Sequence, residues 1–120
     1  MQVIFDEKLV PKLRERYTVL ELDTIMQPNM SFPVRLYAVI EKIGMQDIPI
    51  LEELKELHAQ LISHYKSGEW HLVPHAVEPL MGHWQQELDS FYLSVLDFSA
   101  ECAKLNKTWD GIRHTLPTDG

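Results

Sequence analysis

The segment Gly44-Met45-Gln46-Asp47 decides the fold, because the spacing of the hydrophobic residues changes there. Before this segment, hydrophobic residues alternate with polar ones, as in strands with one buried face. They include Leu20, Leu22, Val34, Leu36, Ala38 and Ile40. After the segment, hydrophobic residues recur at the spacing of an amphipathic helix. They are Ile50, Leu54, Leu57, Leu61 and Tyr65. The order of the two periods predicts strands first and helices second.

A β-hairpin is predicted over residues 17–43. Its strands, residues 17–26 and 34–43, are joined by a segment rich in turn-forming proline and asparagine. The alternation predicts an inner face made of Leu20, Leu22, Thr24, Val34, Leu36 and Ala38. It predicts an outer face made of Glu21, Asp23, Arg35 and Tyr37. We therefore expect Asp23 to lie opposite or diagonal to Arg35 on the outer face.

Three helices are predicted, over about residues 49–67, 70–81 and 87–105, followed by an irregular tail over residues 106–120. Pro49 suits a first helical turn, and Gly68 suits a helix end. Pro74 fits the opening turn of the second helix, and Pro79 would kink or end it. The expected fold class is α+β, with an N-terminal β-hairpin packed on about three C-terminal helices. A chain of 120 residues has the length of one domain, which we expect to span residues 1–120.

The charge balance disfavours binding to nucleic acid. The chain has 18 acidic and 11 basic residues and a net charge of −7, whereas phosphate binding needs clustered lysine and arginine. The basic stretch of Lys8, Lys12, Arg14 and Arg16 is interrupted by glutamates. A charged helix face explains this stretch, and a nucleic-acid-binding module is the weakest of three functional alternatives.

Cysteine content and hydropathy predict a cytoplasmic protein. Cys102 is the single cysteine, so no intramolecular disulfide can form, and its apolar neighbours predict a small buried side chain. The N-terminus lacks the pattern of a signal peptide, and the longest apolar runs are far shorter than the roughly 18 residues of a membrane span. No membrane partner is expected.

The junction Tyr65-Lys66-Ser67-Gly68-Glu69-Trp70 resembles the turn of a tetratricopeptide-type helical hairpin. The resemblance covers residues 57–80 and implies two helices packed against each other. Pro74 and Pro79 depart from the pattern, and one such unit cannot bury its own face without stacked neighbours. The peptide-binding function of that family is therefore not carried over to this chain.

A second resemblance concerns residues 17–24, 80–84 and 87–92. These segments are similar to short proteins of marine tailed phages and marine metagenomes, which have no assigned chemistry. The resemblance implies an infected bacterial cytoplasm as the setting of the protein. It implies no activity.

The middle third of the chain contains a candidate metal site. His71 and His75 are four residues apart, and Glu78 follows three residues later. On a regular helix, these three side chains would share one face and could bind a divalent metal. The alternative function is therefore a metal-dependent hydrolase that uses His71, His75 and Glu78. Against it, Pro74 and Pro79 make a regular helix doubtful, and Leu72 stands where the His-Glu-x-x-His motif has its glutamate.

The hairpin suggests the preferred function. A lone two-stranded sheet has two unpaired edges, and its outer face would carry Arg35, Tyr37 and Val39 as an interaction surface. We expect a non-enzymatic interaction or accessory protein that forms a homodimer or binds a partner protein through this surface. No catalytic residue and no cofactor is expected.

Overall fold

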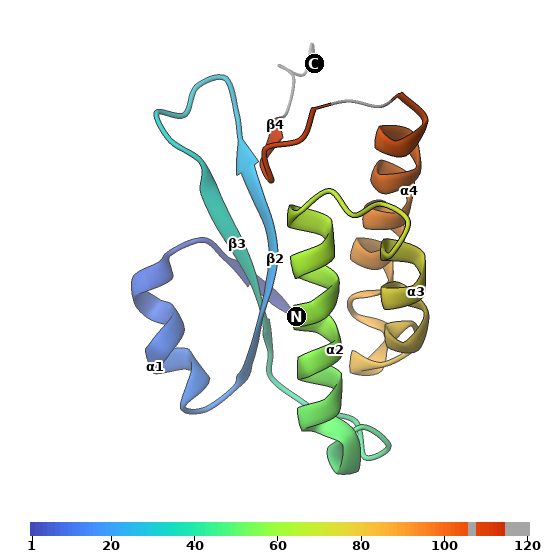
Figure 1. Cartoon of the computed structure of the whole chain (residues 1–120). Coiled ribbons are helices and arrows are strands. Elements are labelled where there is room, and N and C mark those ends of the chain that lie inside the picture. The colour runs from blue at the N-terminus through green and yellow to red at the C-terminus, as the bar shows by residue number, and fades with distance from the viewer. Residues whose placement is uncertain (106–107, 115–120) are drawn as a thin grey trace.

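The structure is a computed structural model that describes residues 1–105 and 108–114. A four-stranded sheet is covered by α1 on one face and by the other helices on the opposite face (Figure 1). The strands are β1 (Gln2–Ile4), β2 (Thr18–Met26), β3 (Val34–Ile40) and β4 (Arg113–His114). The helices are α1 (Val10–Arg14), α2 (Leu51–Lys66), α3 (Val73–Val77) and α4 (Asp89–Leu105). The predicted α+β class is confirmed.

The hairpin forms as predicted, but its register contains a β-bulge. Strands β2 and β3 are antiparallel, with Leu20 opposite Ala38, and the register shifts between Glu21 and Thr24. Because one extra residue reverses the side on which the following side chains point, Thr24 takes the outer position opposite Arg35. Asp23 is buried instead and contacts Tyr65 of α2. The prediction that Asp23 lies on the outer face with Arg35 is therefore wrong.

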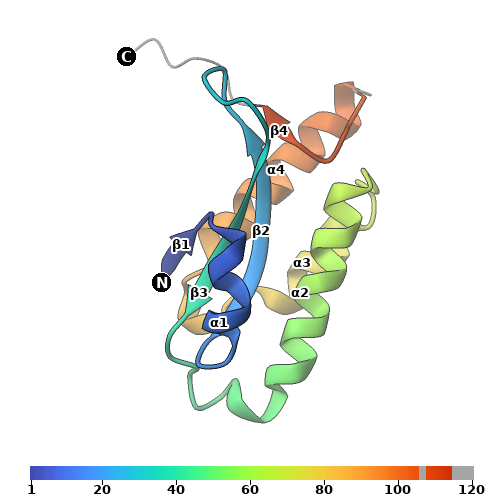
Figure 2. The ribbon, with the colours of Figure 1, turned by 90° about the vertical axis from the view of Figure 1, so that its left-hand side faces the viewer.

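Two short strands extend the hairpin, so the expectation of a lone two-stranded sheet is also wrong. The strand order is β1-β3-β2-β4. Strand β1 pairs antiparallel with β3, and β4 pairs parallel with Ile25 and Met26 at the end of β2 (Figure 2). The predicted irregular tail thus includes a strand, while residues 106–107 and 115–120 lie outside the described residues. Strands of two or three residues are too short to show a period in the sequence.

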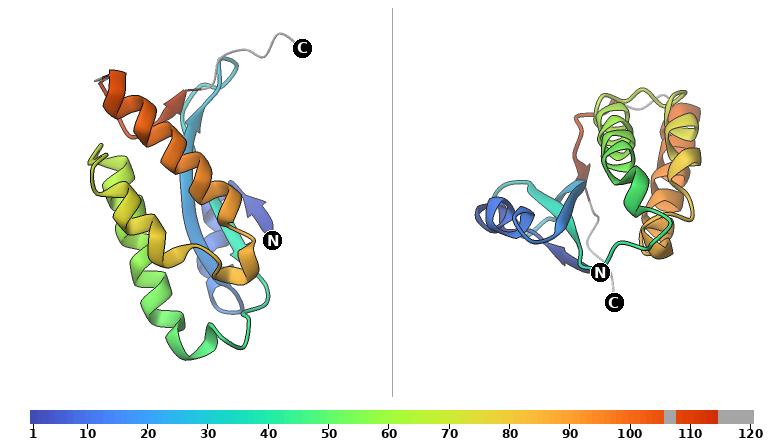
Figure 3. Two further views of the ribbon diagram at one scale, coloured as in Figure 1. Left: turned by 90° about the vertical axis from the view of Figure 1, so that its right-hand side faces the viewer. Right: turned by 90° about the horizontal axis from the view of Figure 1, so that it is seen from below.

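The main core lies between the sheet and the helix layer, in which α3 packs against α2 and α4 (Figure 3). It contains alternate residues of β2 and β3 together with one face of α2 and α4. Its fully or almost fully buried members include Leu20, Leu22, Ala38, Ile40, Leu54, Leu61, Tyr65, Trp84, Leu88, Tyr92 and Val95. Cys102 is buried, as predicted.

A second, smaller core lies under α1 and corrects the predicted interaction surface. Val10 of α1 packs against Val19, Tyr37 and Val39 on the other face of the sheet. The exposed fractions are 6% for Tyr37 and 2% for Val39, whereas Arg35 remains exposed. Tyr37 and Val39 therefore cannot form the exposed surface that the alternation suggested. The reason is that α1 lies across the outer face of the hairpin. The alternation of residues within the hairpin does not show which other element covers that face.

The helices follow the predicted order with shorter bounds. A 3-10 turn, Ile48–Ile50, precedes α2, and residues 70–81 form only α3 and the 3-10 turn Glu78–Leu80. Gly68, at φ +71°, adopts the left-handed conformation that turns the chain from α2 toward α3. Among the described residues, no helix is long and apolar enough to cross a membrane.

Candidate functional site

The free edge of β2 carries unpaired backbone groups. Within one strand, the N–H and C=O of a residue point to the same side. The carbonyl of Glu21 points away from β3, because it accepts a hydrogen bond of 2.6 Å from His58 Nε2. The N–H of Glu21 and both backbone groups of Val19, two residues earlier, therefore face the same edge. No residue in the described part of the chain pairs with these three groups.

His58 is held by a directed chain of buried hydrogen bonds. Its Nε2–H donates to the Glu21 carbonyl, so its Nδ1 is the acceptor of the neutral ring. The Tyr92 hydroxyl donates to that Nδ1 over 2.9 Å and accepts the indole N–H of Trp84 over 3.0 Å. Each of these side chains is at most 2% exposed. The chain Trp84–Tyr92–His58–Glu21 thus fixes one His58 tautomer and links the helix layer to the edge of β2.

Burial disfavours the charged form of both titratable groups in this chain. It lowers the pKa of His58 below the ordinary value of 6.5 and raises the pKa of the Tyr92 hydroxyl. His58 is therefore neutral in the folded protein at pH 7, as its hydrogen bonds require.

The low pKa of His58 predicts a loss of stability in mild acid. Below pH 6.5 the unfolded chain binds a proton at His58 that the folded chain does not, so the free energy of unfolding falls as the pH decreases toward the lowered pKa. His58 can contribute at most about 1.4 kcal/mol per pH unit to this change in the free energy of unfolding. Denaturant titrations between pH 8 and 5 should show this slope, and His58→Asn should remove it.

His75→Asn is the matched control, because the side chain of His75 is exposed. This variant should keep the acid-dependent slope of the unmodified chain. An unchanged slope in His58→Asn would show that another group causes the acid sensitivity.

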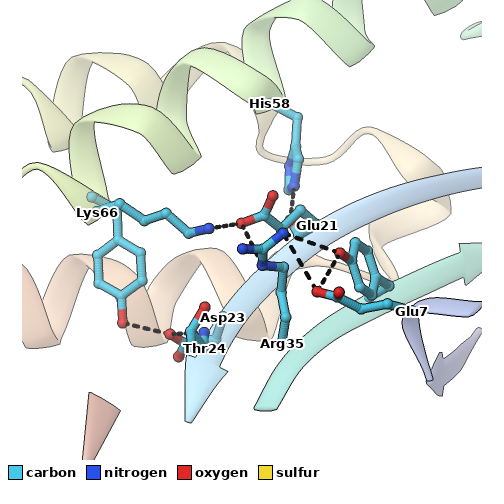
Figure 4. Close-up of polar contacts among 9 residues, drawn as sticks. Glu7, Glu21, Asp23, Thr24, Arg35, His58 and Lys66 are labelled. Carbon is cyan, nitrogen blue, oxygen red and sulfur yellow. Dashed lines mark hydrogen bonds and ion pairs between the residues drawn. The ribbon is translucent and has the colours of Figure 1, made fainter. Parts of the chain in front are cut away.

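The carboxylate of Glu21 is neutralised by neighbouring cations (Figure 4). Lys66 of α2 forms an ion pair with it, and Arg35 Nε lies 4.0 Å from it. Arg35 also contacts Glu7, and the Tyr37 hydroxyl donates to Glu7 over 3.3 Å. The negative charge of Glu21 is therefore compensated where the edge of β2 is open.

A cavity of about 420 Å³ lies at this edge, between the end of α1 and the middle of α2. It is lined by Arg14, Val19, Leu20, Glu21, Lys55, His58, Ala59 and Ile62. A second cavity of about 330 Å³ shares Arg14 and Lys55 with the first and continues toward Glu41 and Ile43. We call the two cavities together the β2 trench. It combines unpaired backbone groups, which can pair with an extended peptide, with three cations, Arg14, Arg16 and Lys55.

The candidate metal ligands do not come together. Pro74 stands at the start of α3 and Pro79 falls in the next 3-10 turn, so α3 is only five residues long. His71 precedes α3, His75 lies in it and Glu78 follows it, and all three are exposed. No group of three histidine, cysteine or acidic side chains that could hold a metal occurs among the described residues. The geometry gives no support to a hydrolase that uses His71, His75 and Glu78.

The basic stretch is divided between different surroundings. Lys8 and Lys12 are exposed, and the Arg16 guanidinium lies 5.9 Å from the centre of the Tyr17 ring. Arg14 alone of the four lines both cavities of the trench. The open edge at Val19 left no signal in the sequence. His58 did leave one, because it lies between Leu54 and Leu61 on the buried stripe of α2.

A second polar centre has a structural role. The buried carboxylate of Asp47 accepts from His83 Nδ1 over 2.7 Å and from the backbone N–H of Trp84 over 2.8 Å. These bonds support a left-handed turn, because Trp84, Gln85 and Gln86 all have positive φ angles. No nucleophilic side chain in the described part of the chain is hydrogen-bonded to His83, so the pair lacks the arrangement of a catalytic triad.

Comparison with known proteins found no family model, curated protein or solved structure that matches this chain. Its function must therefore be inferred from the β2 trench and the residues around it.

Proposed function

We propose that this chain is a non-enzymatic interaction protein that binds an extended segment of a partner protein at the open edge of β2. The unpaired backbone groups of Val19 and Glu21, beside a cavity of about 420 Å³, support this proposal. An added strand would form hydrogen bonds with both residues, as in other cases of β-strand addition. The hairpin remains the binding element, but its edge replaces its outer face.

The two ends of this edge limit the length of the bound segment. Strand β4 pairs with Ile25 and Met26, and the carbonyl of Glu21 already accepts a hydrogen bond from His58. Pairing is therefore confined to a few residues beside Val19 and Glu21. Short pairing of this kind suits a reversible interaction, because few backbone hydrogen bonds are gained for the order imposed on the peptide.

A homodimer is the second candidate, and the outer edge of β1 supports it. Val3 in β1 and Phe5 just after it are 50% and 69% exposed. Two copies could pair their β1 strands across a two-fold axis. Light scattering separates the two candidates, because a homodimer would have twice the 14.0 kDa mass of one chain. The resemblance to marine phage proteins would place either interaction in an infected bacterial cytoplasm.

The trench can be blocked at Ala59, an exposed residue of α2 that lines the cavity. Selection from a displayed library of random 12-residue peptides should yield binders to the unmodified chain. The variant Ala59→Trp should weaken the binding of these peptides at least about tenfold, because the indole fills the space beside Val19. Bound peptide should also slow amide hydrogen exchange at Val19 and Glu21, as measured by NMR.

Glu56→Trp is the matched control, since Glu56 is exposed on the same helix and does not line the trench. It should leave peptide binding unchanged. Peptides that bind Ala59→Trp as tightly as the unmodified chain, or that leave both amides unprotected, would contradict the proposed site.

A further inference from the structure

We infer that the segment bound in the β2 trench carries an acidic side chain, which pairs with Arg14 and Lys55. This inference rests on the proposed function and specifies the chemistry of the partner. The two cations come from different elements, α1 and α2, and both line each of the two cavities. Carboxylate and guanidinium groups form strong, charge-assisted hydrogen bonds.

Arg14 is the cation available for a ligand. It is exposed, and no described residue forms an ion pair or hydrogen bond with its side chain. Near the edge, Lys66 and Arg35 already contact Glu21, and Arg16 lines only the second cavity. Among the residues that the structure describes, Lys55 pairs only with Glu52, which is 85% exposed, at 3.2 Å. Such an exposed pair is weak and readily exchanged for a better partner.

The position of the two cations makes the preference independent of which way the acidic side chain points. Successive side chains of an added strand point to opposite faces of the sheet. Helix α1, which carries Arg14, covers one face, and α2, which carries Lys55, covers the other (Figure 3). An acidic side chain beside Val19 therefore has a cation within the same cavity on either face.

The remaining acidic groups fix where the ligand carboxylate lies. Glu15 and Glu41 line the second cavity but not the first, and would repel a carboxylate there. Glu21 lines the first cavity, but its charge is compensated by Lys66 and Arg35. The favourable position is therefore in the first cavity, beside Val19. This locally cationic site stands out on a chain with a net charge of −7.

Peptide selection followed by synthesis tests this inference. Peptides selected on the unmodified chain should contain an excess of aspartate or glutamate at one position. Three synthetic versions of the tightest peptide, with glutamate, glutamine or lysine there, should bind in that order, with glutamate at least fivefold tighter than glutamine. One of the two single variants Arg14→Gln and Lys55→Gln should reduce the advantage of glutamate to less than twofold, according to the face toward which the acidic side chain points. Lys12→Gln removes the same charge from α1 outside the trench and should preserve the advantage.

The outcomes distinguish this inference from the proposed function. Selected peptides without an acidic excess, which still protect the amides of Val19 and Glu21, would overturn the acidic preference and leave the binding site intact. An equal loss in Arg14→Gln and Lys12→Gln would show a long-range charge effect and would also overturn the pairing with Arg14. Failure to select any peptide that Ala59→Trp excludes would overturn the proposed function itself.

Discussion

Leu61→Ala should lower the free energy of unfolding by about 3–5 kcal/mol. Leu61 is fully buried in the main core, in the third turn of α2. Removing its three outer carbon atoms loses their burial and leaves a cavity, because the surrounding side chains belong to two packed layers and cannot collapse freely. Urea denaturation monitored by circular dichroism measures the effect.

Two variants on α2 calibrate this result. Glu56→Ala, at an exposed position, should change stability by about 0.5 kcal/mol or less. Leu57 belongs to the stripe predicted from the sequence but is only partly buried, so Leu57→Ala should cost clearly less than Leu61→Ala. Equal midpoints for Leu61→Ala and Leu57→Ala would show that the buried face of α2 is assigned wrongly.

Arg113→Met should cost about 3–5 kcal/mol, because it leaves the buried carboxylate of Asp23 without its cation. Arg113 Nε lies 3.2 Å from Asp23 Oδ2, and Arg113 Nη1 donates to the Ser94 hydroxyl over 3.1 Å. Its guanidinium also lies 4.5 Å from the centre of the Phe98 ring. This one side chain therefore joins the C-terminal segment to both β2 and α4. Chemical denaturation at pH 7 measures the loss.

Asp23→Asn provides the control through the pH dependence. Burial raises the pKa of Asp23 above its ordinary value, and Arg113 opposes this rise. Between the ordinary value of 3.8 and the raised pKa, the folded chain binds the proton more tightly, so stability falls as the pH increases. Arg113→Met should raise the pKa of Asp23 further and so extend this pH range to higher pH.

Adding Asp23→Asn to the Arg113→Met chain should remove this pH dependence and restore part of the lost stability. If the double variant were as unstable as Arg113→Met at pH 7, the uncompensated charge would not be the cause.

The sequence by itself determined the order and type of the long elements. The change from a period of two to a helical period at Gly44–Asp47 predicted the hairpin, α2 and α4, because periodicity reports which side of a regular element is buried. The same reasoning identified Cys102 as buried, ended α2 near Gly68 and placed Pro74 in the first turn of the next helix. These features depend on local backbone geometry and local burial, which residues close together in the sequence determine.

The tertiary structure alone decided where the site lies. The hydrogen bond between His58 and Glu21 joins residues 37 positions apart, and the buried Asp23 contacts Tyr65 and Arg113 in distant elements. Helix α1 buried the predicted surface at Tyr37 and Val39, while the edge of β2 at Val19 kept backbone groups without a partner strand. A one-dimensional pattern gives the direction of each side chain relative to its own element. Which faces and edges become covered depends on how distant elements pack, and that is fixed only when the whole chain folds.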